Sequence, residues 1–206
     1  MAYDKFTVLT STAVPMPIEN VDTDQIIPAR FLKATERKGF GDNLFRDWRY
    51  NTDGTPKKDF VLNNPIYSGK ILVGGRNFGS GSSREHAAWA IYDYGFRCVV
   101  SSFFADIFKG NALNIGILPV TVSEAFLDKI FKAIEADPKA EFEVNLPAQT
   151  IRILGSGIRQ VRDLEGAESF DINGYKKHNM THGYDDIDYL QAMKEEVRSF
   201  AEKSLY

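Results

Sequence analysis

The chain has 206 residues, of which 43% are hydrophobic and 26% are charged, and its formal net charge at pH 7 is −3. These values are typical of a globular protein that buries its own core. Without an excess of basic residues, we expect neither a nucleic-acid partner nor binding to an anionic membrane surface. We predict a single domain over residues 1–206.

We also expect no membrane span and no signal peptide. Its longest apolar runs are a handful of residues, and residues 1–20 lack the apolar core of a signal peptide. Cys98 is the only cysteine and lies in the apolar run 98–100, so no disulfide can form within the chain. We expect a buried, unreactive thiol in a protein of the reducing cytoplasm.

The first predicted strand covers residues 6–10, and the stretch 20–28 that follows contains Asp22 and Asp24. Two aspartates one residue apart suggest a divalent-metal site, but no histidine lies nearby to complete a ligand set. Aspartate side chains also commonly hold loops by bonding backbone groups. We therefore favour a structural role for this pair over metal binding.

A cluster of cations comes next, with four of them in the nine residues from Arg30 to Lys38. The ordinary interpretation of such a cluster is a solvated basic loop. The alternative is recognition of an anionic substrate, because a di- or tricarboxylate needs more than one cation. The residues alone leave both interpretations open.

The middle of the chain alternates between strands and helices. Residues 42–68 come first and are rich in turn formers, and the aromatic residues among them indicate that this insertion packs against the rest of the protein. The alternation that follows is typical of an α/β fold. Strands are predicted at 70–74, 97–101 and 117–121, and helices at 84–95, 103–114 and 124–136.

After residue 141 the hydrophobic period changes to two. Strands at 142–146 and 150–154 form a predicted hairpin, and a further strand is predicted from Val161 onward. The chain ends in a predicted amphipathic helix at about 185–204, which covers either the domain or a partner. The predicted fold class is α/β, a three-layer domain with extra β-structure.

His178 and His182 have the spacing of two zinc ligands on one face of a helix. No glutamate lies between them, no third ligand can be placed, and Gly183 ends the helix. We therefore predict no metal site there.

The most informative stretch is residues 74–90, which follows a short apolar strand and reads GGRNFGSGSSREHAAWA. Its glycines permit positive φ angles and close approach of another molecule to the backbone. The helix that begins near residue 84 points its free N–H groups and positive dipole end into this loop. Arg84 adds a planar donor fork suited to carboxylate or phosphate. The residues predict an anion site that contains two serine hydroxyls.

The simplest alternative is that Ser82 only caps the helix, because Ser82-x-x-Glu85 is a capping box. Three other motifs are excluded by spacing. A P-loop would require Lys-Ser/Thr where Ser80-Gly81 stands, and a dinucleotide fingerprint would require glycine where Arg84 stands. A nucleophile elbow would require a serine with glycine two residues away on each side, and none exists here.

Residues 77–87, Asn-Phe-Gly-x-Gly-Ser-Ser-Arg-Glu-His-Ala, resemble the signature of the swivelling domain of the aconitase superfamily. From about Phe6 to Asp188 the chain resembles the small-subunit family of 3-isopropylmalate dehydratase (isopropylmalate isomerase). The stretches that carry this resemblance, in the same order, are 20–28, 39–41, 45–49, 59–63, 93–96, 104–108 and 111–120.

The resemblance implies a swivelling β/β/α domain of aconitase type and a hydro-lyase active only with a large subunit. The implied reaction interconverts 2-isopropylmalate and 3-isopropylmalate through 2-isopropylmaleate, in leucine biosynthesis. The large subunit is expected to carry a [4Fe-4S] cluster, because this chain has no set of cluster cysteines. The stretch 179–187 matches the family and is expected at an interface. Whether the isolated chain forms a homo-oligomer stays open.

The resemblance also assigns site residues. Ser82 is the base that removes a proton beside a substrate carboxylate, Ser83 and Arg84 bind substrate oxygens, and Asp24 orients the site. The residues assigned to supporting the loop are Asn77, Gly79, Gly81 and His86. The residues assigned to substrate choice and binding are Arg30, Phe31, Leu32, Lys33, Thr35 and Arg37. No metal ligand is assigned.

Two other functions stay open. The first is a related hydro-lyase that acts on homoaconitate, citraconate or a methylated malate. The substrate that the 30–35 loop prefers would distinguish it from the isopropylmalate enzyme. A non-catalytic module would use the helix N-terminus only as an anion pocket, and it would bind anions tightly without a partner. A stand-alone serine hydrolase is disfavoured, because the elbow spacing fails.

Overall fold

The computed structural model describes residues 3–33 and 39–203, and its strands form one seven-stranded sheet in the order β4-β3-β2-β1-β5-β6-β7. The strands are β1 (Val8–Met16), β2 (Ile71–Gly74), β3 (Cys98–Ser101), β4 (Leu118–Thr121), β5 (Glu141–Asn145), β6 (Thr150–Ile153) and β7 (Gly166–Ser169). Strands β1 to β4 pair in parallel, whereas β1 with β5, and then β6 and β7, pair antiparallel.

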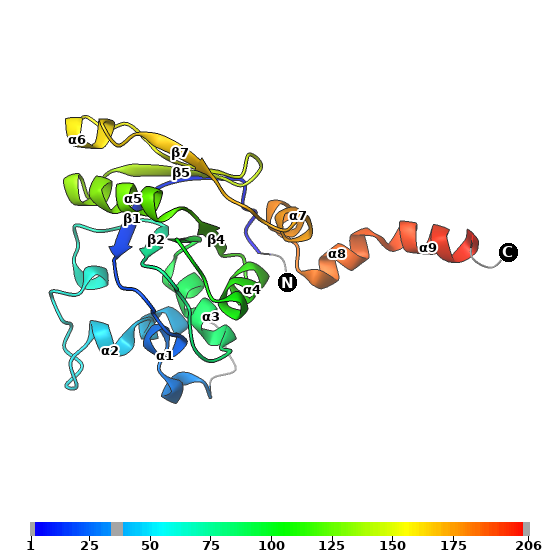
Figure 1. Cartoon of the computed structure of the whole chain (residues 1–206). Helices are drawn as coiled ribbons and strands as arrows, with labels where there is room; N and C mark the ends of the chain where they lie inside the picture. The colour runs from blue at the N-terminus through cyan, green and yellow to red at the C-terminus, as the bar shows by residue number, and fades with distance from the viewer. Residues whose placement is uncertain (1–2, 34–38, 204–206) are drawn as a thin grey trace.

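Strand β1 joins the two halves of the sheet. Its first part, Val8 to Thr12, pairs with β5, and its second part, Ala13 to Met16, pairs with β2. The strand is therefore longer than the predicted 6–10, because it serves two partners in turn. Changing partner along one strand lets the antiparallel half curl over the parallel half (Figure 1).

Helices cover the parallel half on both faces (Figure 1). On one face α3 (Glu85–Tyr94) and α4 (Asp106–Asn114) pack against a cluster that includes Leu72 and Val99. On the other face α5 (Glu124–Ala136) packs against a second cluster, which also takes residues from β5 and β6. Burial on both faces explains why these strands are continuous apolar runs in the sequence. The predicted strands and helices between residues 70 and 136 are confirmed.

The remaining elements are short helices and a C-terminal series. The short α-helices are α1 (Thr23–Ile26), α2 (Arg46–Arg49) and α6 (Arg159–Arg162), and the 3₁₀ turns are η1 (Ala29–Phe31), η2 (Phe40–Asn43) and η3 (Val61–Asn63). The C-terminal helices are α7 (Gly174–His182), α8 (Asp186–Ala192) and α9 (Lys194–Lys203). The strand predicted from Val161 onward is wrong at its start, because α6 occupies that position and β7 begins only at Gly166.

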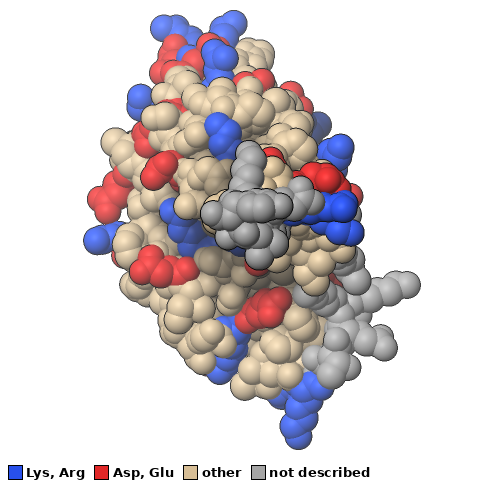
Figure 2. Space-filling view, turned by 90° about the vertical axis from the view of Figure 1, so that its right-hand side faces the viewer, with Lys and Arg blue, Asp and Glu red and all other residues tan. Residues whose placement is uncertain are grey.

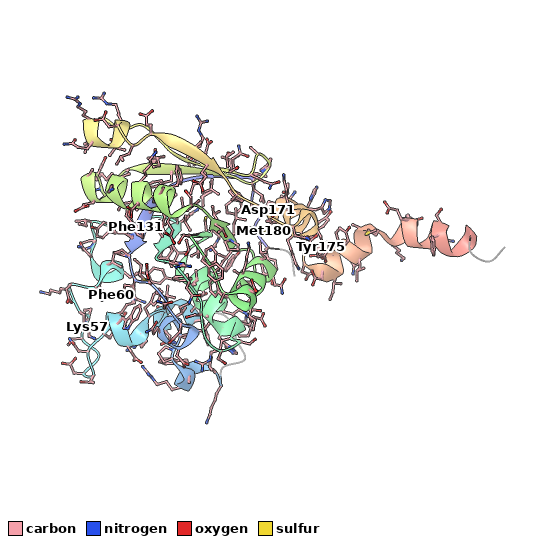
Figure 3. The ribbon with its side chains drawn as sticks, in the orientation of Figure 1. Lys57, Phe60, Phe131, Asp171, Tyr175 and Met180 are labelled. Carbon is pink, nitrogen blue, oxygen red and sulfur yellow. The ribbon has the colours of Figure 1, made fainter. Side chains whose placement is uncertain are left out.

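The turn-rich insertion packs against the rest of the protein through its aromatic residues, as predicted, because Phe45 is fully buried in the cluster that includes Leu72 and Val99. Phe45 stacks on Trp48 with ring centroids 5.5 Å apart, and Phe60 contacts both rings. Lys57 and Phe60 mark this segment in Figure 3, where it lies to the left of the sheet. The guanidinium of buried Arg49 donates to the carbonyl oxygens of Gly41 and Leu44, which ties α2 to the chain before it.

The predicted C-terminal helix at about 185–204 is two helices with a break at Met193. Both extend away from the sheet, beyond α7 with its Tyr175 and Met180 (Figures 1 and 3). Leu190 and Phe200 are 65% and 74% exposed, so these apolar positions do not cover the domain. Coverage by a partner stays a prediction.

The surface shown in Figure 2 carries acidic and basic side chains interspersed, without a large patch of one sign. This distribution agrees with the small net charge of the chain, −3. Over residues 3–33 and 39–203 no helix is long and apolar enough to cross a membrane.

We expect Cys98 to resist iodoacetamide in the folded protein and to react after unfolding in guanidinium. The side chain is fully buried in β3, and burial raises the pKa of the Cys98 thiol far above its ordinary value. The thiol therefore stays protonated in mildly alkaline buffer, and the thiolate is the form that reacts. Intact-mass spectrometry measures the added alkyl group, and stoichiometric labelling of folded protein would contradict the burial.

Candidate active site

The serine loop, residues 75–84, connects the end of β2 to the start of α3. Three of its residues have positive φ angles: 61° at Asn77, 77° at Gly79 and 90° at Gly81. At Gly79 a Cβ atom would lie 2.5 Å from the Cβ of Phe108 on α4, so only glycine lets the loop pass this close to the helix. The Asn77 side chain donates to Oδ1 of Asn20 at 2.9 Å.

Residues 21–23 hold the loop from its other side. The backbone N–H of Thr23 donates to the Ser80 carbonyl oxygen, and the Thr23 hydroxyl donates to the Ser82 carbonyl oxygen, both at 2.9 Å. Val21 accepts from the N–H groups of Gly79 and Ser80 at 2.8 and 3.1 Å. These bonds bring two stretches almost sixty residues apart into one rigid unit.

The two aspartates of this stretch have different places. Asp22 caps α1: its side chain accepts from the Gln25 backbone N–H at 2.7 Å. In turn, the Asp22 backbone N–H donates to Oε1 of Gln25 at 2.8 Å. The structural role predicted for Asp22 is therefore confirmed. Asp24 points to the serine loop instead, where its carboxylate pairs with the guanidinium of Arg84.

The structure also decides whether Ser82 is a helix cap. Helix α3 begins at Glu85 and its N-cap residue is Arg84, with no side-chain capping bond. Ser82 and Ser83 are exposed, and over the described residues neither hydroxyl has a hydrogen-bond partner. The capping-box interpretation of Ser82 is therefore wrong, and both hydroxyls are available to a ligand.

A cavity of about 590 Å³ lies over this loop. The residues that line it are Leu32, Ser82, Ser83, Arg84, Glu85, His86 and Asn111. Arg84 brings a positive charge with 15% of its side chain exposed, and the amide end of α3 lies beside it. Two hydroxyls, a guanidinium and a helix N-terminus together suit a ligand with carboxylate groups.

His86, at the start of α3, packs against two aromatic rings. Its ring centroid lies 4.4 Å from that of Trp89 and 5.6 Å from that of Phe40. The indole nitrogen of Trp89 donates to the Glu85 carboxylate at 3.0 Å. This packing fixes the side of the cavity formed by the first turn of α3.

The structure separates the predicted substrate loop. Leu32 lines the serine cavity, but Arg30 and Phe31 line a different cavity of about 780 Å³, beside Asp47 and Lys57. Arg30 pairs with the Asp47 carboxylate through both guanidinium NH₂ groups, one of them at 3.0 Å, and this contact lowers the pKa of Asp47.

Contact of Arg30 and Phe31 with substrate stays a prediction, and this geometry does not support it. Lys33 is exposed. Thr35 and Arg37, the remaining members of the predicted set, lie outside the described residues.

Asn111 is a cavity residue that sequence reasoning missed. It lies on α4, three residues after Phe108, which packs on the serine loop. Side chains three apart on a helix share a face, and this spacing is the signal that points to Asn111 once the role of Phe108 is known.

The two C-terminal histidines, four residues apart, lie side by side on α7. Their rings stack with centroids 4.2 Å apart, and Nδ1 of His182 lies 2.9 Å from the His178 carbonyl oxygen. Among residues 3–33 and 39–203, no group of three or more His, Cys, Asp or Glu side chains is placed to hold a metal ion.

Comparisons with known proteins show the family of this chain. Residues 3–125 match the family model described as the aconitase C-terminal domain. The 3-isopropylmalate dehydratase small subunit of Cytophaga hutchinsonii is 62% identical over 203 residues, covering 98% of this chain and 97% of that protein. The small subunit of the same name from Christiangramia forsetii is 58% identical, covering 97% of this chain and 94% of that protein.

The crystal structure of a 3-isopropylmalate dehydratase from Methanocaldococcus jannaschii has a similar fold. It superposes with a TM-score of 0.64 at 24% sequence identity, covering 94% of this chain and 99% of that one. The sequence matches run almost from end to end and include the serine loop. The chain therefore belongs to the aconitase C-terminal domain family and, within it, to the small subunits of 3-isopropylmalate dehydratase.

Proposed function

We propose that this chain is the small subunit of a hydro-lyase that interconverts 2-isopropylmalate and 3-isopropylmalate through 2-isopropylmaleate, in leucine biosynthesis. The observation that carries the proposal is that the hydroxyls of Ser82 and Ser83 do not cap α3 and lie in one cavity with Arg84. The high identity to proteins named 3-isopropylmalate dehydratase small subunit supports the choice of substrate.

Ser82 acts as the base in this reaction. Its deprotonated Oγ takes the proton from the carbon beside a substrate carboxylate, the C–H electron pair forms the C=C bond, and hydroxide leaves from the neighbouring carbon. A serine hydroxyl ionises at neutral pH only in a strongly positive local potential. Arg84 and the amide end of α3, a helix of ten residues, supply that potential. Rehydration at the other carbon reverses these steps and completes the isomerisation.

The other groups of the cavity bind and orient the substrate. Ser83 and Arg84 bind carboxylate oxygens, and Asp24 orients the Arg84 guanidinium through their ion pair. Leu32 presents apolar surface to the isopropyl group from its place in the same cavity. Asn77, Gly79, Gly81 and His86 hold the loop in shape.

The residues of this chain do not fit an iron–sulfur cluster, because the single cysteine, Cys98, is buried in β3. We assign a [4Fe-4S] cluster to a large-subunit partner, where it would supply a Lewis acid for the departing hydroxide. The name "small subunit" of the relatives supports such a partner. We place the enzyme in the cytoplasm, where a lone free thiol is common.

An anaerobic mixing assay tests the proposal. This chain is combined with a cluster-loaded large subunit, and the ultraviolet absorbance of the unsaturated intermediate is followed from each isopropylmalate, with each subunit alone as control. We expect activity only in the mixture. Complex formation without turnover of either isopropylmalate would contradict the substrate and favour a sister hydro-lyase. Absence of any complex would contradict the two-subunit enzyme and favour an anion-binding module.

A further inference from the structure

Helix α4 and the residues just before it pack closely against the serine loop. Phe108 packs on Gly79 and contacts the Phe78 ring with centroids 5.3 Å apart. The backbone adds two bonds, from the Phe78 N–H to the Phe103 carbonyl oxygen at 3.0 Å and from the Ala105 N–H to the Phe78 carbonyl oxygen at 3.2 Å. A side chain on the loop-facing side of α4 therefore has a fixed position relative to the serine hydroxyls.

Asn111 is such a side chain. It is half-buried and lines the cavity with Ser82, Ser83 and Arg84. In the described part of the chain its carboxamide makes no hydrogen bond, unlike that of Asn114 on the same helix, whose Oδ1 accepts from Lys176 at 2.8 Å. A half-buried amide beside an anion-binding cavity has a donor available for a ligand.

Such a donor would add to the cations of the site. A substrate with two carboxylates presents several acceptor oxygens, and among the described residues that line the cavity the one cation, Arg84, already shares its guanidinium with Asp24. Glu85, the other charged residue among the described ones that line the cavity, is negative and accepts from Trp89. An amide adds donors to this environment without adding charge, so it leaves the positive potential at Ser82 unchanged.

We infer that Asn111 is a substrate-binding residue, whose side-chain Nδ2 donates a hydrogen bond to a substrate carboxylate oxygen on the α4 side of the cavity. This inference rests on the proposed function of the serine loop. It extends the site from the loop to a second helix, which then contributes to binding without taking part in proton transfer.

The test compares Asn111→Asp with Asn114→Asp in the complete two-subunit enzyme. Both variants change one amide of α4 into a carboxylate of the same size, but only the first lies at the serine cavity. Loss of a hydrogen bond to a charged group weakens the affinity for the substrate by about 10- to 100-fold. We expect KM to rise by about this factor in Asn111→Asp and to stay unchanged in Asn114→Asp. In Asn111→Leu, which adds no charge beside Ser82, we expect the same rise in KM with kcat within about threefold.

Two further variants and two physical measurements distinguish binding from structure. Asn111→Gln keeps the amide and is expected to recover part of the lost affinity, whereas Asn111→Leu is not. Thermal melting and complex formation are expected to match the unchanged chain in every variant. Equal KM values for Asn111→Asp and Asn114→Asp, or a loss of kcat alone, would overturn the inference. An inactive unchanged enzyme would instead contradict the proposed function.

Discussion

Replacing Ser82 with alanine lowers kcat of the assembled enzyme by about 10²- to 10⁴-fold, the range expected when a general base is lost. Alanine removes the oxygen that receives the substrate proton, whereas Arg84, Ser83 and the α3 N-terminus remain to bind carboxylates. KM is therefore expected to change by no more than a few-fold. Steady-state kinetics of the complex with each isopropylmalate measures both constants.

Ser83→Ala is the matched control for this prediction, since it removes a neighbouring hydroxyl from the same cavity. We expect Ser83→Ala to raise KM more than it lowers kcat, because its proposed role is binding. Stability and assembly are expected to be unaffected in both variants, because both side chains are exposed. A Ser82→Ala subunit that assembled and kept full turnover would remove the proposed base.

Replacing Gly79 with alanine destabilises the folded chain by about 2–5 kcal/mol, the sum of left-handed strain and overpacking. The φ angle of Gly79 is +77°, and the new methyl group would overlap the Phe108 side chain that fastens α4 to the serine loop. Urea unfolding of the small subunit, followed by circular dichroism, measures the loss from the shift in midpoint.

Gly54→Ala separates the two causes of that loss. Its φ angle is +83°, close to that of Gly79, but a Cβ there meets nothing within 4 Å. We expect only the strain of the left-handed backbone, about 1–2 kcal/mol. If both variants lost the same free energy of unfolding, the close contact between Gly79 and Phe108 would not contribute.

Much of the fold follows from local sequence pattern. The strands and helices from residue 70 to 136 are visible because buried parallel strands are continuous apolar runs and the helices between them have a period near 3.6. The hairpin at 142–154 is visible from its period of two. Elements that depend on distant partners are missed or misplaced, as with the second half of β1, which exists because it pairs with β2.

The C-terminal segment shows the same limit. Its apolar spacing predicts a helix correctly, but spacing does not say what the apolar face contacts. The structure places Leu190 and Phe200 in solvent, on helices that project from the domain (Figure 1). Whether a face is covered depends on tertiary and quaternary neighbours, which a single element does not encode.

For the site, the sequence by itself determined which groups of the proposed chemistry lie together: the two serines, the arginine and the glycines lie in one short stretch, residues 74–90, so their proximity needs no folding. Only the tertiary structure decided their surroundings. It brought Asp24 to Arg84, paired Arg30 with Asp47 outside the cavity, and added Asn111 from α4. These contacts join residues 17 to 60 positions apart, and such pairings arise from packing of whole elements, which local periodicity does not specify.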